Sequence, residues 1–107
     1  MTEVVVTAVF QPAPGAKEPL IAALREGIPA VHAESGCLLY AIHDAEDGTI
    51  VMLEKWTSRD DLDAHAAGQA VVQLNALITP YLGRPVTVTT MTAIPAGTAS
   101  TEPKLPM

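Results

Sequence analysis

Apolar and polar residues in the middle of the chain alternate with a period of two, which predicts a β-hairpin. Its strands are 38–44 and 49–56, and the turn between them is 45–48. One face of the second strand carries the row Ile50, Met52, Glu54 and Trp56. A carboxylate therefore lies in an apolar row. Because burying an unpaired carboxylate costs several kcal/mol, we expect Glu54 to reach water, a partner or a polar cavity.

Two elements are predicted before the hairpin. Residues 4–10 are rich in β-branched side chains and predict a strand, which the segment 11–15 ends. From Ala16 to about residue 35, apolar residues recur at helical spacing. They form the stripe Leu20, Leu24, Ile28 and Val31. Pro29 is expected to kink or shorten this helix, and Gly36 to terminate it.

After the hairpin, Ser58 is a candidate N-cap, followed by acidic residues where the helix dipole favours negative charge. Gly68 interrupts the helical pattern, which resumes over 70–82. Its apolar stripe is Val71, Leu74, Leu77, Ile78 and Tyr81. A last strand is predicted over 86–94.

The predicted order is strand, helix, strand, strand, helix, strand. That order is typical of an α+β, ferredoxin-like split βαβ fold, with helices on one face of a four-stranded antiparallel sheet. The other face would be bare, although both faces of the strands carry apolar or β-branched residues. We therefore expect two sheets to pair face to face in a homodimer. The domain is predicted to span 1–94, and 95–107 to form a flexible tail.

Composition narrows the choice of partners and location. The formal charge of −6 would repel a phosphate backbone, so nucleic-acid binding is not expected. No apolar run approaches the length of a membrane span, and the N-terminus lacks the basic region of a signal peptide. These features predict a cytoplasmic protein. The single cysteine, Cys37, is interpreted as a buried structural thiol.

Several residues together carry a family resemblance. They are Glu34-Ser35-Gly36-Cys37, Tyr40, Glu54-Lys55-Trp56, Leu62 and His65. This set resembles the E-x-G-C…Y…E-x-W…L-x-x-H pattern of the antibiotic biosynthesis monooxygenase family, and the resemblance spans about 4–94. It implies a dimeric α/β barrel. Characterised members include oxygenases that act on polycyclic aromatic phenols or quinols without metal, flavin or haem, and others degrade haem or isomerise phosphorylated sugars.

His65 is the natural candidate for a general base, because an ordinary imidazole titrates near neutral pH. Glu54 could accept a hydrogen bond from His65 and fix its tautomer, or act on the substrate itself. The alternative is a purely structural pair that ties the helix to the sheet. His43 has the opposite strand parity from Tyr40, and His32 is expected to be solvated near a helix end.

Four further side chains are candidates for substrate binding. Trp56 offers a flat apolar wall for an aromatic ligand, although a lone tryptophan on a strand more often belongs to the core. Tyr40, Tyr81 and Asn75 could each bring a polar group to the pocket. No metal site is expected, because the histidines and the cysteine form neither an H-x-x-x-H nor a C-x-x-C cluster. The haem-degrading branch is not matched, since the first strand contains no asparagine and the helix around His65 no tryptophan.

The leading hypothesis is a cofactor-independent monooxygenase, in which the protein deprotonates a small phenolic, quinol or polycyclic aromatic substrate that then reacts with dioxygen. Two alternatives stay open. One is a non-catalytic protein that binds an aromatic metabolite, and the other is an isomerase or cyclase that uses the same acid and base without oxygen.

Overall fold

The computed structural model describes residues 2–96, and one of its two layers is a four-stranded sheet. The strands are β1 (Val4–Phe10), β2 (Cys37–Asp44), β3 (Ile50–Trp56) and β4 (Thr87–Met91). Their order is β2-β3-β1-β4, and every neighbouring pair is antiparallel. This confirms the predicted ferredoxin-like sheet. The last strand is shorter than expected, and the predicted tail lies outside the described residues from 97 onward.

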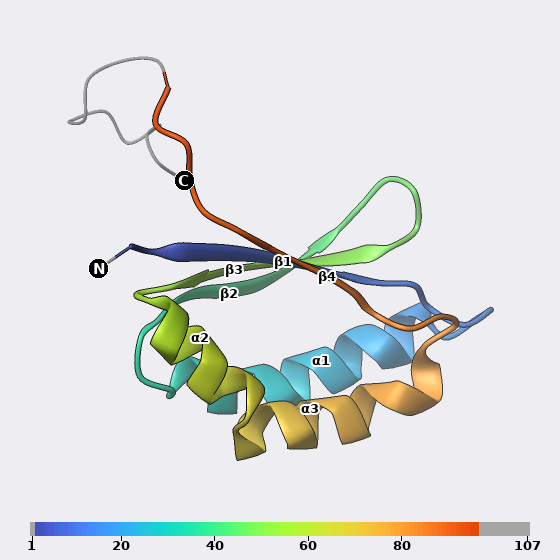
Figure 1. The fold of residues 1–107 in the computed structure, drawn as a ribbon. Coiled ribbons are helices and arrows are strands. Elements are labelled where there is room, and N and C mark those ends of the chain that lie inside the picture. The colour runs from blue at the N-terminus through green and yellow to red at the C-terminus, as the bar shows by residue number, and fades with distance from the viewer. Residues whose placement is uncertain (1, 97–107) are drawn as a thin grey trace.

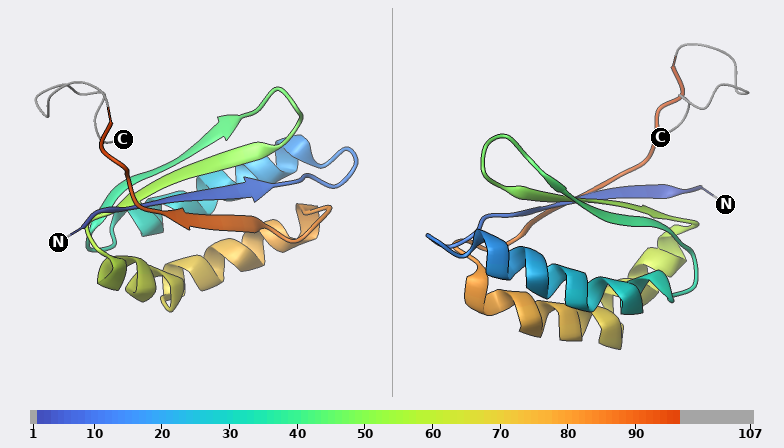
Figure 2. Two further views of the ribbon diagram at one scale, coloured as in Figure 1. Left: turned by 45° about the horizontal axis from the view of Figure 1, so that its top comes forward. Right: turned by 180° about the vertical axis from the view of Figure 1, so that it is seen from behind.

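The second layer consists of helices that all lie on the same side of the sheet (Figures 1 and 2). They are α1 (Lys17–His32), α2 (Arg59–Ala66), α3 (Gln69–Ile78) and the short 3-10 helix η1 (Thr79–Tyr81). Gly68 separates α2 from α3 and is the N-cap of α3, in agreement with the sequence pattern. The predicted helix 70–82 changes to 3-10 geometry at η1, where Pro80 lies in the first turn.

Pro29 does not end the first helix, because α1 continues to His32. Its ring is on the exposed side, so the helix gives up one backbone hydrogen bond without losing its buried face. The helix ends earlier than expected, with Ala33 as its C-cap, and Gly36, with φ of 79°, lies further on in the turn before β2. Ser58 is confirmed as the N-cap of α2, since its hydroxyl accepts from the amide of Asp61 at 3.2 Å.

The core lies between the two layers and follows the predicted alternation. The inward residues of β3 are Ile50, Met52, Glu54 and Trp56, and all four are buried. The predicted stripe of α1 is buried against them. Helices α1 and α3 approach closely at Gly27, where a Cβ atom would lie 2.5 Å from Cδ1 of Leu74. Close packing of these helices closes the layer under the sheet.

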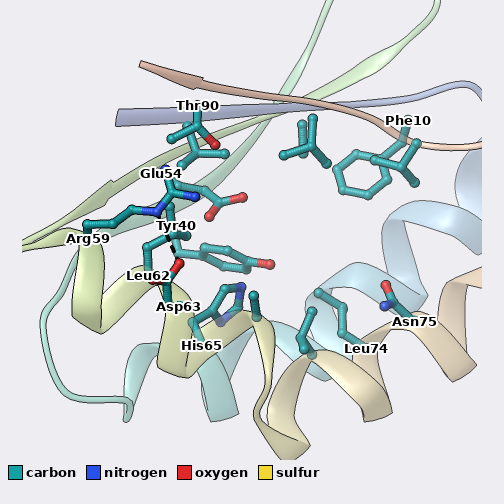
Figure 3. Close-up of a pocket in the computed structure, with 16 residues that line it drawn as sticks. Phe10, Tyr40, Glu54, Arg59, Leu62, Asp63, His65, Leu74, Asn75 and Thr90 are labelled. Atoms are coloured by element: carbon teal, nitrogen blue, oxygen red, sulfur yellow. Dashed lines mark hydrogen bonds and ion pairs between the residues drawn. The ribbon is translucent and has the colours of Figure 1, made fainter. Parts of the chain in front are cut away.

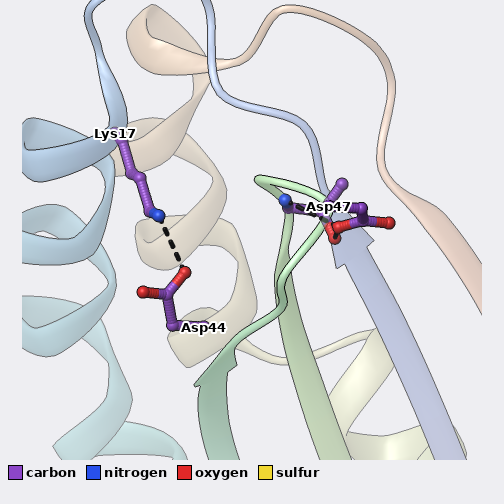
Figure 4. A network of polar contacts seen from close by, with 4 residues as sticks. Lys17, Asp44 and Asp47 are labelled. Carbon is purple, nitrogen blue, oxygen red and sulfur yellow. Dashed lines mark hydrogen bonds and ion pairs between the residues drawn. The ribbon is translucent and has the colours of Figure 1, made fainter.

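Polar contacts hold the end of the β2–β3 hairpin (Figure 4). Asp47 accepts hydrogen bonds from the amide and the hydroxyl of Thr49, at 3.0 and 2.6 Å, and these bonds lower the pKa of Asp47. Lys17 at the start of α1 pairs with Asp44 at 2.8 Å. Helix α1 is thereby tied to the hairpin at the point where the chain reverses.

The sheet face opposite the helices is not covered by any described element (Figure 2). By the strand register it carries mostly aliphatic and threonine side chains, among them Thr7, Val9, Ala41, Val51, Leu53 and Met91. Within residues 2–96, no helix is both long and apolar enough to cross a membrane.

Candidate functional site

A cavity of about 390 Å³ lies between the inner face of the sheet and helices α2 and α3 (Figure 3). Most of its wall is apolar, with side chains from β1, α2, α3, β4 and the residue that precedes β4. These are Val6, Ala8, Phe10, Leu62, Ala66, Val71, Leu74, Val86 and Val88. The polar lining residues are Tyr40, Glu54, Arg59, Asp63, His65, Asn75 and Thr90. The cavity is of the size and polarity expected for a small, largely apolar ligand.

Glu54 brings a carboxylate into this apolar space from the middle of β3. Its side chain is only 5 % exposed, and Figure 3 shows the carboxylate pointing into the cavity. Oε1 accepts a hydrogen bond from the indole Nε1–H of Trp56 at 3.0 Å. Burial raises the pKa of Glu54, while the hydrogen bond from Trp56 and the nearby His65 oppose the rise. Glu54 is therefore a buried carboxyl group suited to exchanging a proton with a ligand.

His65 reaches the same cavity from α2 and is also 5 % exposed. Its ring stacks on Trp56, with centroids 4.6 Å apart, and meets Tyr40 edge to face at 5.4 Å. The expected hydrogen bond to Glu54 is not formed. Instead, Nδ1 of His65 lies 2.7 Å from Oε1 of Glu34, because the turn after α1 brings Glu34 next to α2. The carboxylate that bonds His65 is therefore one that the sequence reasoning did not select.

Tyr40 and Asn75 both line the cavity, as the sequence suggested for them. Figure 3 shows the Tyr40 hydroxyl pointing into the open space. Burial, with a smaller contribution from Glu54 and Glu34, raises the pKa of Tyr40 well above its ordinary value. Tyr40 therefore stays a neutral phenol that can donate a hydrogen bond.

Trp56 and Tyr81 do not line this cavity. Trp56 is 0 % exposed and is enclosed by core residues, so it belongs to the core and does not offer the expected stacking surface to a ligand. It instead supports Glu54 by a hydrogen bond and His65 by stacking. Tyr81 lies in η1, beyond the end of α3, and packs against the edge of the core.

Two charged residues of the lining were missed by the sequence reasoning. Arg59 and Asp63 form an exposed ion pair at 3.0 Å on α2. Together with Leu62 and Ala66 they follow i, i+3, i+4, i+7 spacing, so the helical face was readable once the helix start at Ser58 was set. Arg59 brings a cation to the mouth of the cavity.

The remaining histidines and the cysteine, which were considered as candidate metal ligands, lie outside the cavity. His32 is exposed and bonds the carbonyl of Tyr40 at 2.9 Å, and His43 is exposed on β2. Cys37 is half-buried rather than buried, and desolvation raises the pKa of its thiol. Within residues 2–96, no three His, Cys, Asp or Glu side chains are grouped as a metal would require.

The resemblance seen in the sequence is confirmed by comparison with known proteins. The sequence model of the antibiotic biosynthesis monooxygenase family matches residues 3–76. "Putative monooxygenase Rv0793" of Mycobacterium tuberculosis is 34% identical over 97 residues, covering 90% of this chain and 96% of that protein.

Solved structures agree with this assignment. The structure of Rv0793 superposes with a TM-score of 0.78 at 35% identity, over 92% of this chain and 100% of that one. A structure described as an antibiotic biosynthesis monooxygenase gives a TM-score of 0.77 at 29% identity, over 86% and 99% of the two chains. The fold, the motif and these similarities together show that the chain belongs to the antibiotic biosynthesis monooxygenase family.

Proposed function

We propose that this protein is a cofactor-independent monooxygenase that acts with dioxygen on a small phenolic, quinol or polycyclic aromatic substrate. One observation carries the proposal. An apolar cavity contains two buried groups that can take up a proton, His65 and Glu54, which come from different elements and line the same space. Such an arrangement suits removal of a proton from a ligand whose remainder is aromatic and uncharged.

In the proposed reaction His65 removes the phenolic proton, and the electron-rich phenolate reacts at a ring carbon with dioxygen. For a quinol, one oxygen atom remains on the ring as a new oxygen substituent and the other leaves as water. The substrate supplies all four electrons, because a quinol and O₂ together contain the atoms of a hydroxyquinone and one water. Tyr40 and Asn75 can donate hydrogen bonds to oxygen atoms on which negative charge develops.

Glu54 has a separate part in this proposal. Its carboxylate points into the cavity and its pKa is raised by burial, so it can accept a proton from the substrate and pass it to the departing oxygen. The cavity is lined by two carboxylates, Glu54 and Asp63, and its one arginine, Arg59, is already paired with Asp63. This lining disfavours ligands that carry carboxylate or phosphate groups. This charge balance argues for a neutral phenol over a phosphorylated sugar.

The experiment is oxygen uptake by chelator-treated protein with a panel of hydroquinones and polycyclic phenols. We expect uptake that survives the chelator and is abolished in His65→Ala. His32→Ala is the matched control, because His32 is exposed and outside the cavity. Product formation without oxygen would indicate an isomerase or cyclase. Ligand binding with no turnover would indicate a binding protein.

We also propose that two copies of the chain pair through the uncovered face of the sheet. The face carries apolar and threonine side chains and no described helix packs on it. Sedimentation equilibrium at micromolar concentration should give twice the 11.2 kDa chain mass. Replacing Leu53 by Lys on this face should produce monomers, whereas a stable monomer of the unaltered chain would contradict the pairing.

A further inference from the structure

We propose that Glu34 is the positioning residue for His65, and that it fixes the imidazole with its proton on Nδ1 and its lone pair on Nε2 facing the cavity. The catalytic part of this inference rests on the proposed function, whereas the pairing of the two side chains does not. The pairing gives Glu34 a role in the site that the sequence motif alone did not reveal.

The first support is the contact itself. Oε1 of Glu34 lies 2.7 Å from Nδ1 of His65, and the side chains are 22 % and 6 % exposed. A short contact between partly buried groups is a charge-assisted hydrogen bond. An ionised carboxylate can only accept, so Nδ1 must donate. In the neutral ring Nε2 then has no proton.

The second support is the position of Nε2. Among the described residues, every side-chain nitrogen or oxygen that is fully shut off from solvent has a hydrogen-bond partner. The structure shows a bond for Nδ1 of His65 and none for Nε2, so Nε2 is not shut off from solvent. The open space that the His65 side chain lines is the cavity. Trp56 stacks on the ring and Tyr40 packs at its edge, which leaves the imidazole little freedom to turn.

The third support is the way in which Glu34 is itself held. It lies in the turn between α1 and β2, and the carbonyl of the nearby Gly36 accepts from the amide of Thr57 at 2.9 Å. The other carboxylate oxygen, Oε2, lies against Gly68, where a Cβ atom would come within 3.1 Å of it. Gly68 is the N-cap of α3, and a helix N-terminus favours a neighbouring negative charge. The absence of a side chain at Gly68 thus leaves space for the Glu34 carboxyl group beside the N-terminus of α3.

A ligand hydroxyl bound at Nε2 would extend this pair to carboxylate, imidazole and hydroxyl, the arrangement by which an acid orients a base in other enzymes. It also separates the roles of the two glutamates. Glu34 acts behind the imidazole, whereas Glu54 faces the ligand directly. Glu34 is not among the residues that line the cavity, so its removal should leave the shape of the site intact.

The first test measures the tautomer and needs no substrate. ¹⁵N chemical shifts of the His65 ring in its neutral form should show a protonated Nδ1 and an unprotonated Nε2. In Glu34→Gln the amide can either accept or donate, so the two tautomers should become mixed. Glu26→Gln, at an exposed position of α1, is the matched control and should leave the spectrum unchanged. A proton on Nε2 in the unaltered protein would overturn the proposal.

The second test uses turnover of whichever phenol the oxygen-uptake panel identifies. We expect Glu34→Gln to lower kcat by about 10²- to 10⁴-fold with KM nearly unchanged, as for other residues that orient a catalytic histidine. Full activity of Glu34→Gln would overturn the positioning role and leave the monooxygenase proposal standing. If the unaltered protein consumes no oxygen, the proposed function fails, and the tautomer measurement alone decides the role of Glu34.

Discussion

Trp56 donates its indole N–H to Glu54 at 3.0 Å, two residues earlier on the same face of β3. A carboxylate is thereby kept inside a core that is otherwise apolar. Burial raises its pKa, so the folded state holds the proton of Glu54 more tightly than the unfolded chain does. The site carries a cost in stability, as is common where function requires a buried charge.

Glu54→Gln should therefore stabilise the protein at neutral pH. A raised pKa in the folded state contributes stability that is present below the ordinary carboxyl pKa and is lost as the pH rises through the raised value. We expect the free energy of unfolding at pH 7 to increase by about 1 kcal/mol, with the gain disappearing below about pH 4. Urea titrations at both pH values measure this, with exposed Glu46→Gln as control. A loss of stability at pH 7 would contradict it.

Trp56→Phe should have the opposite effect. It removes the donor to Glu54 and leaves a buried acceptor without its partner, so we expect a loss of about 2 kcal/mol or more at pH 7. The loss should be smaller in the Glu54→Gln background, because the neutral amide is less costly to leave unpaired. A double-mutant cycle from chemical denaturation measures the difference, and equal losses in the two backgrounds would show that the hydrogen bond is unimportant.

Much of the fold was predictable because it depends on local periodicity. Alternation along β3 placed Glu54 on the buried face, and the serine before two aspartates marked the start of α2 at Ser58. These features depend on neighbours within a few residues. The effect of Pro29 could not be read in the same way, since whether a proline kinks or shortens a helix depends on which face it occupies in the packed structure.

The arrangement of the site was harder to predict, because it joins segments that are distant in sequence. Glu34 and His65 are separated by 31 positions, and only the packing of the α1–β2 turn against α2 brings them together. Strand parity placed Trp56 beside Glu54 correctly, but parity cannot tell a side chain that lines a cavity from one enclosed in the core. Whether an inward-facing side chain lines the cavity or is enclosed in the core depends on which other elements pack over it, and that packing is a tertiary property.

Gly36→Ala tests the turn that carries Glu34. Gly36 has φ of 79°, and a Cβ atom there would collide with the side chain of Asp61, so both conformational strain and overlap oppose the substitution. Gly48 is a matched control, since it has φ of 91° and nothing within 4 Å of the added atom. We expect losses of about 3 kcal/mol for Gly36→Ala and about 1 kcal/mol for Gly48→Ala in chemical denaturation. Equal losses would mean that contact with Asp61 does not constrain the turn.

Tyr40 should remain a neutral phenol in the folded protein far into the alkaline range. Its pKa is raised by burial and then by the carboxylates of Glu54 and Glu34, so the absorbance of its phenolate should be absent through about pH 11. The difference between the unaltered protein and Tyr40→Phe at 295 nm isolates this group, and Tyr81→Phe serves as control.

The raised pKa of Tyr40 also makes the stability of the protein depend on pH in the alkaline range. Above about pH 10 the unfolded chain loses the Tyr40 proton first, so the folded protein should lose stability as the pH rises, and Tyr40→Phe should lose less. Ionisation of Tyr40 near pH 10 in the folded state would show that water reaches its hydroxyl freely. A neutral Tyr40 at working pH can only stabilise charge on a ligand by donating a hydrogen bond, which leaves proton removal to His65 and Glu54.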